Sequence, residues 1–399
     1  MSIHQAKPGD KIVIGDKITI AANDLQSLLS TLTKKGYRNI GPTLREGAVV
    51  YDDISGIKDL PQGWTDDQGR ASYRLIEAPN KAFFGYTQGV QSWKRFLHPP
   101  TRHIWGATKD SQGFKLEENA NDFPKLAFIG VRPCELTAIS ILDKALKDGP
   151  YRDYNYASLR KNIFIVAVNC SEAGGTCFCV SMKSGPKATT GFDLALTELI
   201  DDDSHLFLIE VGTQAGADAV SKLTRHKAGK AEIGAAEKSV FQAASQMART
   251  VDTNGIKELL YRNYDNPQWE SAAKRCLSCG NCTMACPTCF CSTVEDTTDL
   301  VGSRADRTLK WDSCFTIDFS YIHGGSIRTS TKSRYRQMVT HKLATWYEQF
   351  GTTGCVGCGR CITWCPAAID ITEEVGAIRE SERTAMATVK VKEGSNANN

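Results

Sequence analysis

The sequence of 399 residues lacks any long apolar run. Its most hydrophobic stretches, such as Phe164–Val168 and Leu206–Ile209, are strand-sized and fall far short of the roughly 20 residues that a membrane helix needs. The segment Met1–Gly15 also lacks the apolar core of a secretory signal. We therefore expect a soluble, cytoplasmic protein.

The sequence also has little net charge and no nucleotide-binding motif. Its 48 basic and 45 acidic residues leave a formal charge of +3, which favours neither nucleic acid nor an anionic membrane as a partner. No G-x-G-x-x-G follows an expected strand, and no Walker A motif is present. We expect no NAD or FAD site and no catalytic residue in this chain.

The first half of the chain has the pattern of alternating strands and helices. The segment Lys11–Ile20 alternates like strands, and Asn23 or Asp24 then caps a helix that closes at Gly36. An apolar strand leads into an amphipathic helix within Lys125–Leu146, and further strands are expected at Asn162–Val168 and Leu206–Gly212. This order predicts a mixed or parallel sheet with helices on its faces.

The composition changes near residue 213, where Ala, Lys and Glu become frequent and β-formers rare. The fold class that this predicts is α+β multidomain. We expect an N-terminal α/β domain over residues 1–225, an all-α dicluster ferredoxin domain over 226–375, and a polar C-terminal tail over 376–399. The last residues, from about Glu380, are expected to fray.

Fifteen cysteines are present, which is unusual for such a chain. The odd total, the two-residue spacings and the lack of a signal segment argue against a secreted disulfide framework. Reduced thiolates that hold metal fit this pattern better.

Eight of these cysteines form two blocks with the spacing Cys-x2-Cys-x2-Cys-x3-Cys-Pro, which is the bacterial ferredoxin signature, and its duplication indicates two [4Fe–4S] clusters. In each block the fourth cysteine reaches the cluster of the other block. The predicted ligand sets are Cys276, Cys279, Cys282 and Cys365 for the first cluster, and Cys355, Cys358, Cys361 and Cys286 for the second.

Structural zinc is the alternative for these blocks. Zinc sites usually have two Cys-x2-Cys pairs separated by a longer loop, so a triplet plus a fourth cysteine, present twice, has the wrong count. Cys286 and Cys355 lie 69 positions apart, which is much more than a compact β-type ferredoxin uses. Helical segments around the blocks favour an all-α ferredoxin domain, although a β-type ferredoxin with an insertion also fits.

Four further cysteines follow two expected strands of the α/β domain. Parallel strand ends commonly lie side by side at the edge where such sheets bind ligands. Four thiolates there would hold a third [4Fe–4S] cluster, and the alternative is a group of buried free thiols. We favour the cluster, with the ligands Cys134, Cys170, Cys177 and Cys179.

Three cysteines remain: Cys289, Cys291 and Cys314. The triplet Cys-Phe-Cys occurs at both 177–179 and 289–291, which suggests ligation shared between domains. Three thiolates need a further ligand to complete a zinc or cluster site, and His323 is a candidate. A lone histidine nearby is more often structural, so these three residues are retained only as weaker candidates for metal binding.

Together, several motifs resemble one known family: GVRPCE, NCSEAGGTCFC, RCLSCGNCTMACPTCFC, WDSCFTIDFSYIHGG and GCVGCGRCITWCP. They are similar to the electron-transfer β subunit of soluble NAD(P)-linked [NiFe] hydrogenases, or sulfhydrogenases, and to its relative, the A subunit of anaerobic sulfite reductase. The resemblance runs from about Lys125 to Val375 and is weak over the first hundred residues.

The resemblance implies a non-catalytic iron–sulfur subunit of a hetero-oligomeric oxidoreductase. Its implied partners are the [NiFe] hydrogenase small and large subunits and a flavin/NAD(P)-binding subunit, between which it relays electrons. One alternative is the anaerobic sulfite reductase subunit that feeds a sirohaem subunit. The others are an enzyme that uses a special cluster in the α/β domain and, from another class, a zinc-stapled scaffold.

Overall fold

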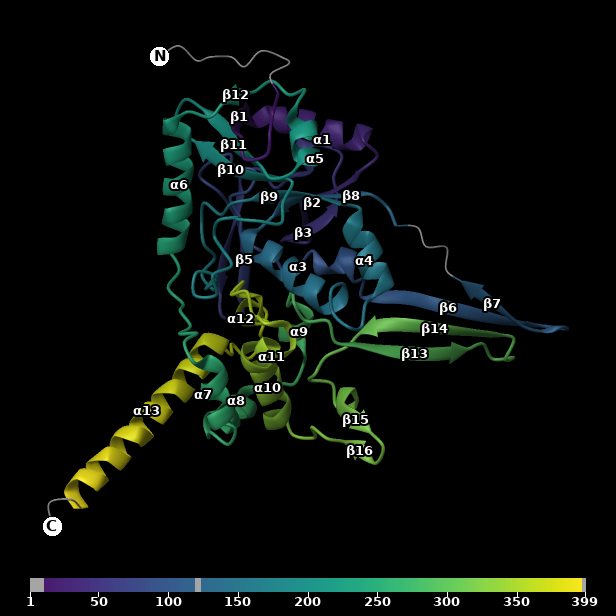
Figure 1. Cartoon of the computed structure of the whole chain (residues 1–399), viewed down its shortest axis with the longest axis vertical. Coiled ribbons are helices and arrows are strands. Elements are labelled where there is room, and N and C mark those ends of the chain that lie inside the picture. Colours follow the sequence, from purple (N-terminus) through teal and green to yellow (C-terminus); the bar gives the residue numbers. More distant parts are fainter. Residues whose placement is uncertain (1–10, 119–122, 397–399) are drawn as a thin grey trace.

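A computed structural model describes residues 11–118 and 123–396 (Figure 1). Its N-terminal part is built on an eight-stranded sheet of order β12-β1-β11-β10-β9-β8-β2-β3. The strands are β1 (Lys17–Ala21), β2 (Arg38–Arg45), β3 (Ala48–Asp53), β8 (Leu126–Val131), β9 (Ile163–Val168), β10 (Leu194–Ile200), β11 (His205–Val211) and β12 (His226–Lys227).

The sheet is mixed, as the sequence predicted. Its centre is parallel, since β2, β8, β9 and β10 pair in the same direction, and both edges are antiparallel. The central strand β8 is buried at all six positions, because helices cover both faces. The carboxyl ends of β8 and β9 lie next to each other, and this places the loops that follow them at one edge.

Helices cover the sheet on both sides. On one face, α1 (Leu25–Lys34) and α5 (Gln214–Val220) bury Leu, Ile and Val side chains against the strands. On the other face lie α3 (Pro133–Leu146), α4 (Tyr154–Lys161) and the short α2 (Lys94–Leu97), around a stack of Trp93 on Phe128. Helix α6 (Lys230–Ser245) packs on β10 and β11.

The local predictions hold in part. The strands at β8, β9 and β11 and the helices α1 and α3 are present. The first strand begins at Lys17 rather than Lys11, and Asp24 precedes α1 without a side-chain cap hydrogen bond. The strands β2, β3 and β10 were not predicted.

Two smaller sheets extend from this body. The hairpin β4 (Trp64–Gly69) and β5 (Ser72–Glu77) reaches toward the cysteine blocks, where the Ala71 amide donates to the Ile362 carbonyl oxygen. A four-stranded sheet of order β13-β14-β6-β7 projects sideways (Figure 1). It joins β6 (Thr101–Asp110) and β7 (Gly113–Glu118) to β13 (Ser292–Thr298) and β14 (Arg304–Trp311), which lie between the cysteine blocks and were not predicted.

The rest of the cysteine-bearing part is helical, as predicted. Its elements are α7 (Ile256–Arg262), α8 (Gln268–Arg275), α9 (Asn281–Met284), α10 (Thr331–Thr340), the π-helical turn η4 (His341–Thr345), α11 (Trp346–Phe350), α12 (Arg360–Thr363) and α13 (Ile371–Asn396). The short elements η1 (Ala22–Asp24), η2 (Ile57–Asp59), η3 (Asp318–Ser320), β15 (Tyr321–Ile322) and β16 (Gly325–Ser326) complete the described chain. The core of this part packs around Trp269, Tyr335 and Leu343, and cysteines of both blocks lie against it.

The expectation of a frayed C-terminus is wrong for residues 380–396, because α13 continues to Asn396 and extends away from the body (Figure 1). Residues 397–399 lie outside the described chain. The predicted boundary at residue 225 falls one residue before β12, which pairs with β1. No helix within residues 11–118 and 123–396 is long and apolar enough to cross a membrane.

Candidate metal centres

The two cysteine blocks have the same backbone course. The residue before the second cysteine is left-handed in both, Ser278 at φ 53° and Gly357 at φ 65°. The residue after it is also left-handed, Gly280 at φ 75° and Gly359 at φ 78°, and each of these glycines precedes a four-residue helix. The repeated spacing therefore corresponds to a repeated loop that curls the first three thiols of each block toward one point.

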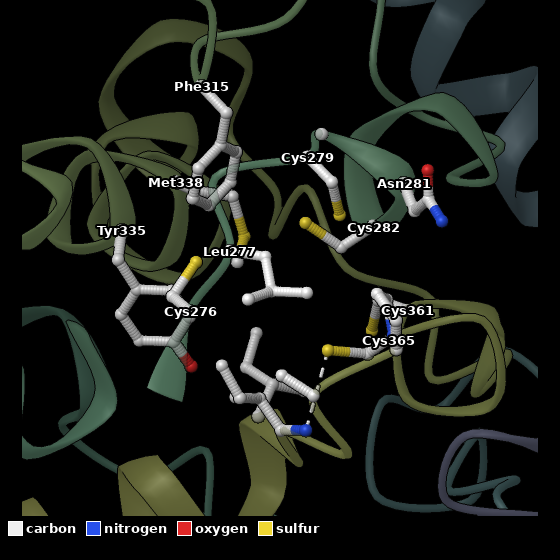
Figure 2. Close-up of a pocket in the computed structure, with 15 residues that line it drawn as sticks. Cys276, Leu277, Cys279, Asn281, Cys282, Phe315, Tyr335, Met338, Cys361 and Cys365 are labelled. Carbon is white, nitrogen blue, oxygen red and sulfur yellow. Dashed lines mark hydrogen bonds between the residues drawn. The ribbon is translucent and has the colours of Figure 1, made fainter. Parts of the chain in front are cut away.

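The first predicted ligand set lines one cavity (Figure 2). Cys276, Cys279 and Cys282 come from the first block, and Cys365 comes from the end of the second. The Ser278 amide donates to Cys276 Sγ and the Ile369 amide to Cys365 Sγ, both at 3.4 Å. Amide donors of this kind stabilise negative charge on cluster-bound sulfur. Phe315, Tyr335 and Met338 close the apolar side of the cavity.

The second predicted set also converges. Cys286 interacts electrostatically with Cys355, Cys358 and Cys361, and the Gly357 amide donates to Cys355 Sγ at 3.4 Å. Cys361 lines the first cavity as well, so the two sets adjoin. The structure thus brings the fourth cysteine of each block to the triplet of the other block.

Most of these thiols are shielded from water. Burial raises the pKa of Cys355 to about 12 and that of Cys361 well above the ordinary thiol value, and neighbouring cysteines raise both further. Cys286 differs, because a hydrogen bond with Cys289 and the charge of Lys342 lower its pKa. A metal that binds such thiols must displace their protons, so binding is coupled to proton release.

The third predicted set lines a cavity of its own. Cys134 lies in the first turn of α3, after β8, and Cys170, Cys177 and Cys179 follow β9. The donors that face these sulfurs are polar side chains: Gln88 Nε2 donates to Cys134 Sγ at 2.7 Å, and the Arg132 side chain hydrogen-bonds to Cys170. Desolvation raises the pKa of Cys177 to about 12.

The second and third sets touch through backbone. Cys358 and Gly357 line the cavity of the third set, and the Phe178 amide donates to the Gly357 carbonyl oxygen at 2.9 Å. A Cβ on Gly357 would lie 2.7 Å from the backbone nitrogen of Cys179, and one on Gly359 would lie 2.4 Å from Thr176 Oγ1. A side chain at either position would force the facing loop to shift.

A buried ion pair spans the same boundary. Arg360 and Glu135 are each 1% exposed, and their side chains meet at 2.8 Å. Tyr51 Oη donates to the second carboxylate oxygen of Glu135 at 2.8 Å. The Arg360 side chain also donates to the carbonyl oxygens of Gly89 and Gln91 and hydrogen-bonds to Cys358. The guanidinium therefore neutralises charge from both sides of the boundary.

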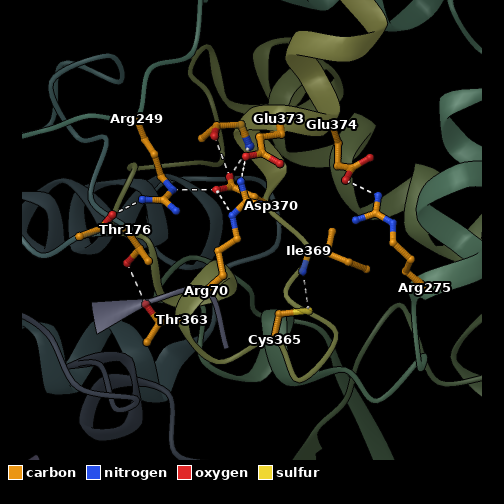
Figure 3. Close-up of polar contacts among 12 residues, drawn as sticks. Arg70, Thr176, Arg249, Arg275, Thr363, Cys365, Ile369, Asp370, Glu373 and Glu374 are labelled. Atoms are coloured by element: carbon orange, nitrogen blue, oxygen red, sulfur yellow. Dashed lines mark hydrogen bonds and ion pairs between the residues drawn. The ribbon is translucent and has the colours of Figure 1, made fainter. Parts of the chain in front are cut away.

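A second polar network holds the end of the second block (Figure 3). Asp370, whose side chain is 1% exposed, accepts from Arg249 at 2.7 Å and lies 3.6 Å from Arg70. Arg249 also donates to the Gly175 carbonyl oxygen, beside the third set. This network fixes the loop of Cys365 to the loop that carries Cys177 and Cys179.

The three remaining cysteines form a separate group. Cys291 and Cys314 share a side-chain hydrogen bond, which lowers the pKa of Cys291 to about 7, and both line a cavity of about 730 Å³ together with Cys289. His323 lies in the exposed turn between β15 and β16 and is not among the residues that line this cavity. The position of His323 therefore gives no support to its suggested role as a ligand. The two Cys-Phe-Cys triplets line different cavities, so the structure does not bring them to one shared site.

Comparisons with known proteins decide the class of the two blocks. Residues 275–369 match the family model described as a 4Fe-4S dicluster domain. The chain contains a 4Fe–4S dicluster domain. A domain of this kind holds two [4Fe–4S] clusters.

The chain as a whole also has a homologue beyond this domain. This chain is 28% identical over 333 residues to sulfhydrogenase 2 subunit beta of Pyrococcus furiosus. The aligned region covers 81% of this chain and 94% of that protein. The resemblance to hydrogenase β subunits is therefore confirmed, and the homology extends into the α/β part. No solved structure matches the chain.

The cysteine sets differ from sites for a single ion. In the described part of the chain, no group of three or more His, Cys, Asp or Glu side chains is close enough to hold one metal ion in common. The ligands of a cubane are instead spread around four irons, so the dicluster domain needs its thiols farther apart than a zinc site does.

The sequence did not point to the residues that surround the thiols of the second and third sets. Arg360, Lys342 and Gln88 each contact a cysteine sulfur, yet none belongs to a recognised motif. The π-helical turn that presents Lys342 is a known mark of functional segments but has no sequence signature of its own. Only Arg360 had a positional hint, since it stands within the second block.

Proposed function

We propose that the chain is the electron-relay subunit of a cytoplasmic multisubunit oxidoreductase. It would relay electrons between a [NiFe] hydrogenase module and a flavin/NAD(P) subunit. The homologue is named as a sulfhydrogenase β subunit, and this supports the hydrogenase assignment over the sulfite reductase alternative.

The observation that carries this proposal is the serial arrangement of the thiol sets. Cys361 adjoins the first cavity, and Cys358 adjoins the cavity of the third set. The second set thus lies between the other two. A series of this kind suits a relay, whereas a scaffold stapled by metal has no need for adjoining sites.

The ligand sets that we propose are the crossed ones. The first is Cys276, Cys279, Cys282 and Cys365, and the second is Cys355, Cys358, Cys361 and Cys286. A [4Fe–4S] cluster, when bound, supplies one-electron redox chemistry. The chain holds the thiols, supplies amide donors to Cys276, Cys355 and Cys365, and excludes water by packing Phe315 and Tyr335 over the first cavity.

A third [4Fe–4S] cluster at Cys134, Cys170, Cys177 and Cys179 is part of the proposal. Its support is the shared cavity and the presence of Gln88 and Arg132, whose side chains donate to two of the four sulfurs. Hydrophobic packing alone would not require such donors beside buried free thiols.

Cys286→Ser tests the crossed assignment. The cluster bound by Cys355, Cys358 and Cys361 should lose or change its EPR signal, while the cluster bound by the other three cysteines of the first block should keep its signal. Cys365→Ser is the matched variant and should perturb the reverse cluster. Damage confined in each variant to the cluster of the mutated block would show that the pairing is not crossed.

A further inference from the structure

Cys289, Cys291 and Cys314 lie outside the predicted cubane sets but close to them. All three line the cavity of about 730 Å³. Cys289 shares a hydrogen bond with Cys286 of the second set, and Cys314 interacts electrostatically with Cys282 of the first. The group therefore adjoins both predicted cubane sites of the dicluster domain.

Two buried lysines face this group. Lys342 is 6% exposed and donates to Cys286 Sγ and Thr288 Oγ1, both at 3.0 Å. Lys94 is 3% exposed, donates to the Cys289 carbonyl oxygen at 2.8 Å and lies 3.8 Å from the centre of the Trp311 ring. Burial of two ammonium groups is costly unless negative charge lies nearby, and thiolates are the source available here.

The cavity itself favours an anionic occupant. The cationic side chains of Arg328 and Lys342 line it, and none of its described lining residues is an Asp or a Glu. Its volume is in the range of small-molecule sites. Phe290, between two of the cysteines, packs edge-on against Trp346 and Phe350 and so fixes the wall that carries the thiols.

We propose that Cys289, Cys291 and Cys314 bind a further [4Fe–4S] cluster through three thiolates. The fourth iron, without a cysteine ligand, faces the cavity and accepts a small anion with a soft donor atom. This site goes beyond the relay proposed above, because it provides an iron that exchanges ligands. It does not depend on the third cluster or on the crossed pairing.

Iron and acid-labile sulfide analysis of the anaerobically purified full chain tests the site. Cys291→Ser with Cys314→Ser should lower the iron and sulfide content by about four each per chain. Gln337→Ala is the control, because Gln337 lines the same cavity but has no sulfur. The iron and sulfide content of this variant should equal that of the wild type. An unchanged iron content in the double variant would overturn the proposal.

Cyanide binding to the wild-type chain tests the open iron without any variant. Added cyanide should shift the EPR signal of one cluster and leave the signals of the others unchanged. If the double variant loses all its iron through misfolding, this titration decides alone. No shift of any cluster signal at saturating cyanide would overturn the open-iron site, and the eight dicluster cysteines would be unaffected by that result.

Discussion

The two cysteine blocks are alike in spacing and backbone but differ in their surroundings. In the first block, Cys279 is exposed and Asn281 makes only a long contact, 3.4 Å, to the Trp364 carbonyl oxygen. In the second block, Cys358 is buried, and Arg360, at the position equivalent to Asn281, forms the buried pair with Glu135. The position that Ser278 has in the first block is occupied in the second block by Gly357, whose backbone packs closely against that of Cys179.

This difference shows that some residues of a block present the thiols, whereas other residues fix where the block lies in the protein. The repeated loop is sufficient to present three thiols, because both blocks have it. The two residues that differ, Gly357 and Arg360, join the second block to the sheet domain. The first block is therefore the end of the series nearer to solvent, and the second is its inner member.

The largest effect is expected from Arg360→Met. This change leaves the Glu135 carboxylate buried without its ionic partner and should lower the free energy of unfolding by about 3–5 kcal/mol. Anaerobic denaturant unfolding of the iron-loaded chain, followed by fluorescence, measures it.

Asn281→Ala is the matched control in the first block and should change the free energy of unfolding by less than about 0.5 kcal/mol. Equal losses of unfolding free energy in Arg360→Met and Asn281→Ala would contradict the stronger anchoring of the second block.

A smaller effect is expected from Gly357→Ser. Serine can adopt this left-handed conformation, as Ser278 does at φ 53° in the first block, although a side chain there is strained. The added Cβ would nevertheless lie 2.7 Å from the Cys179 backbone nitrogen, so overpacking should cost about 1–3 kcal/mol of unfolding free energy. The same unfolding experiment measures this loss.

The reciprocal change, Ser278→Gly, removes the hydrogen bond between Ser278 Oγ and Thr331 Oγ1 but relieves the left-handed backbone strain of a serine. Because these two effects oppose each other, the free energy of unfolding should stay within about 1 kcal/mol of the wild type. If Gly357→Ser lowered the free energy of unfolding no more than Ser278→Gly does, the second block would not be tightly packed against the Cys177–Cys179 loop.

The smallest effect is expected in the rates at which the two clusters release their iron. Because Cys279 is exposed while Cys358 and Cys286 are buried, an iron chelator should remove the cluster of the first set several-fold faster than that of the second. The decay of the two EPR signals under anaerobic chelation measures the two rates. Release in the opposite order would place the second set nearer to solvent.

Much of this arrangement could be predicted from the sequence. Cysteine spacing predicted the two-cluster domain because the loop that presents the thiols is local. Apolar strands followed by amphipathic helices predicted the mixed sheet, and the neighbouring ends of β8 and β9 brought together the four cysteines of the third set, as expected.

The rest depends on contacts between distant residues. Arg360 and Glu135 are 225 positions apart, and nothing in either local pattern identifies the partner. The strands β13 and β14 have mostly polar sequences and are strands because β14 pairs with β6, nearly 200 residues earlier. The cavity lined by Cys289, Cys291 and Cys314 likewise combines α3, the segment that follows the first block and the π-helical turn.

The most direct test of the central claim, that the thiol sets bind redox-active iron–sulfur clusters, is metal and sulfide analysis of the anaerobically purified chain. The dicluster domain alone predicts about eight irons and eight sulfides per chain, and each further cluster adds about four of each. The account predicts a content well above eight and no stoichiometric zinc. A folded, colourless chain with zinc in place of iron would contradict it.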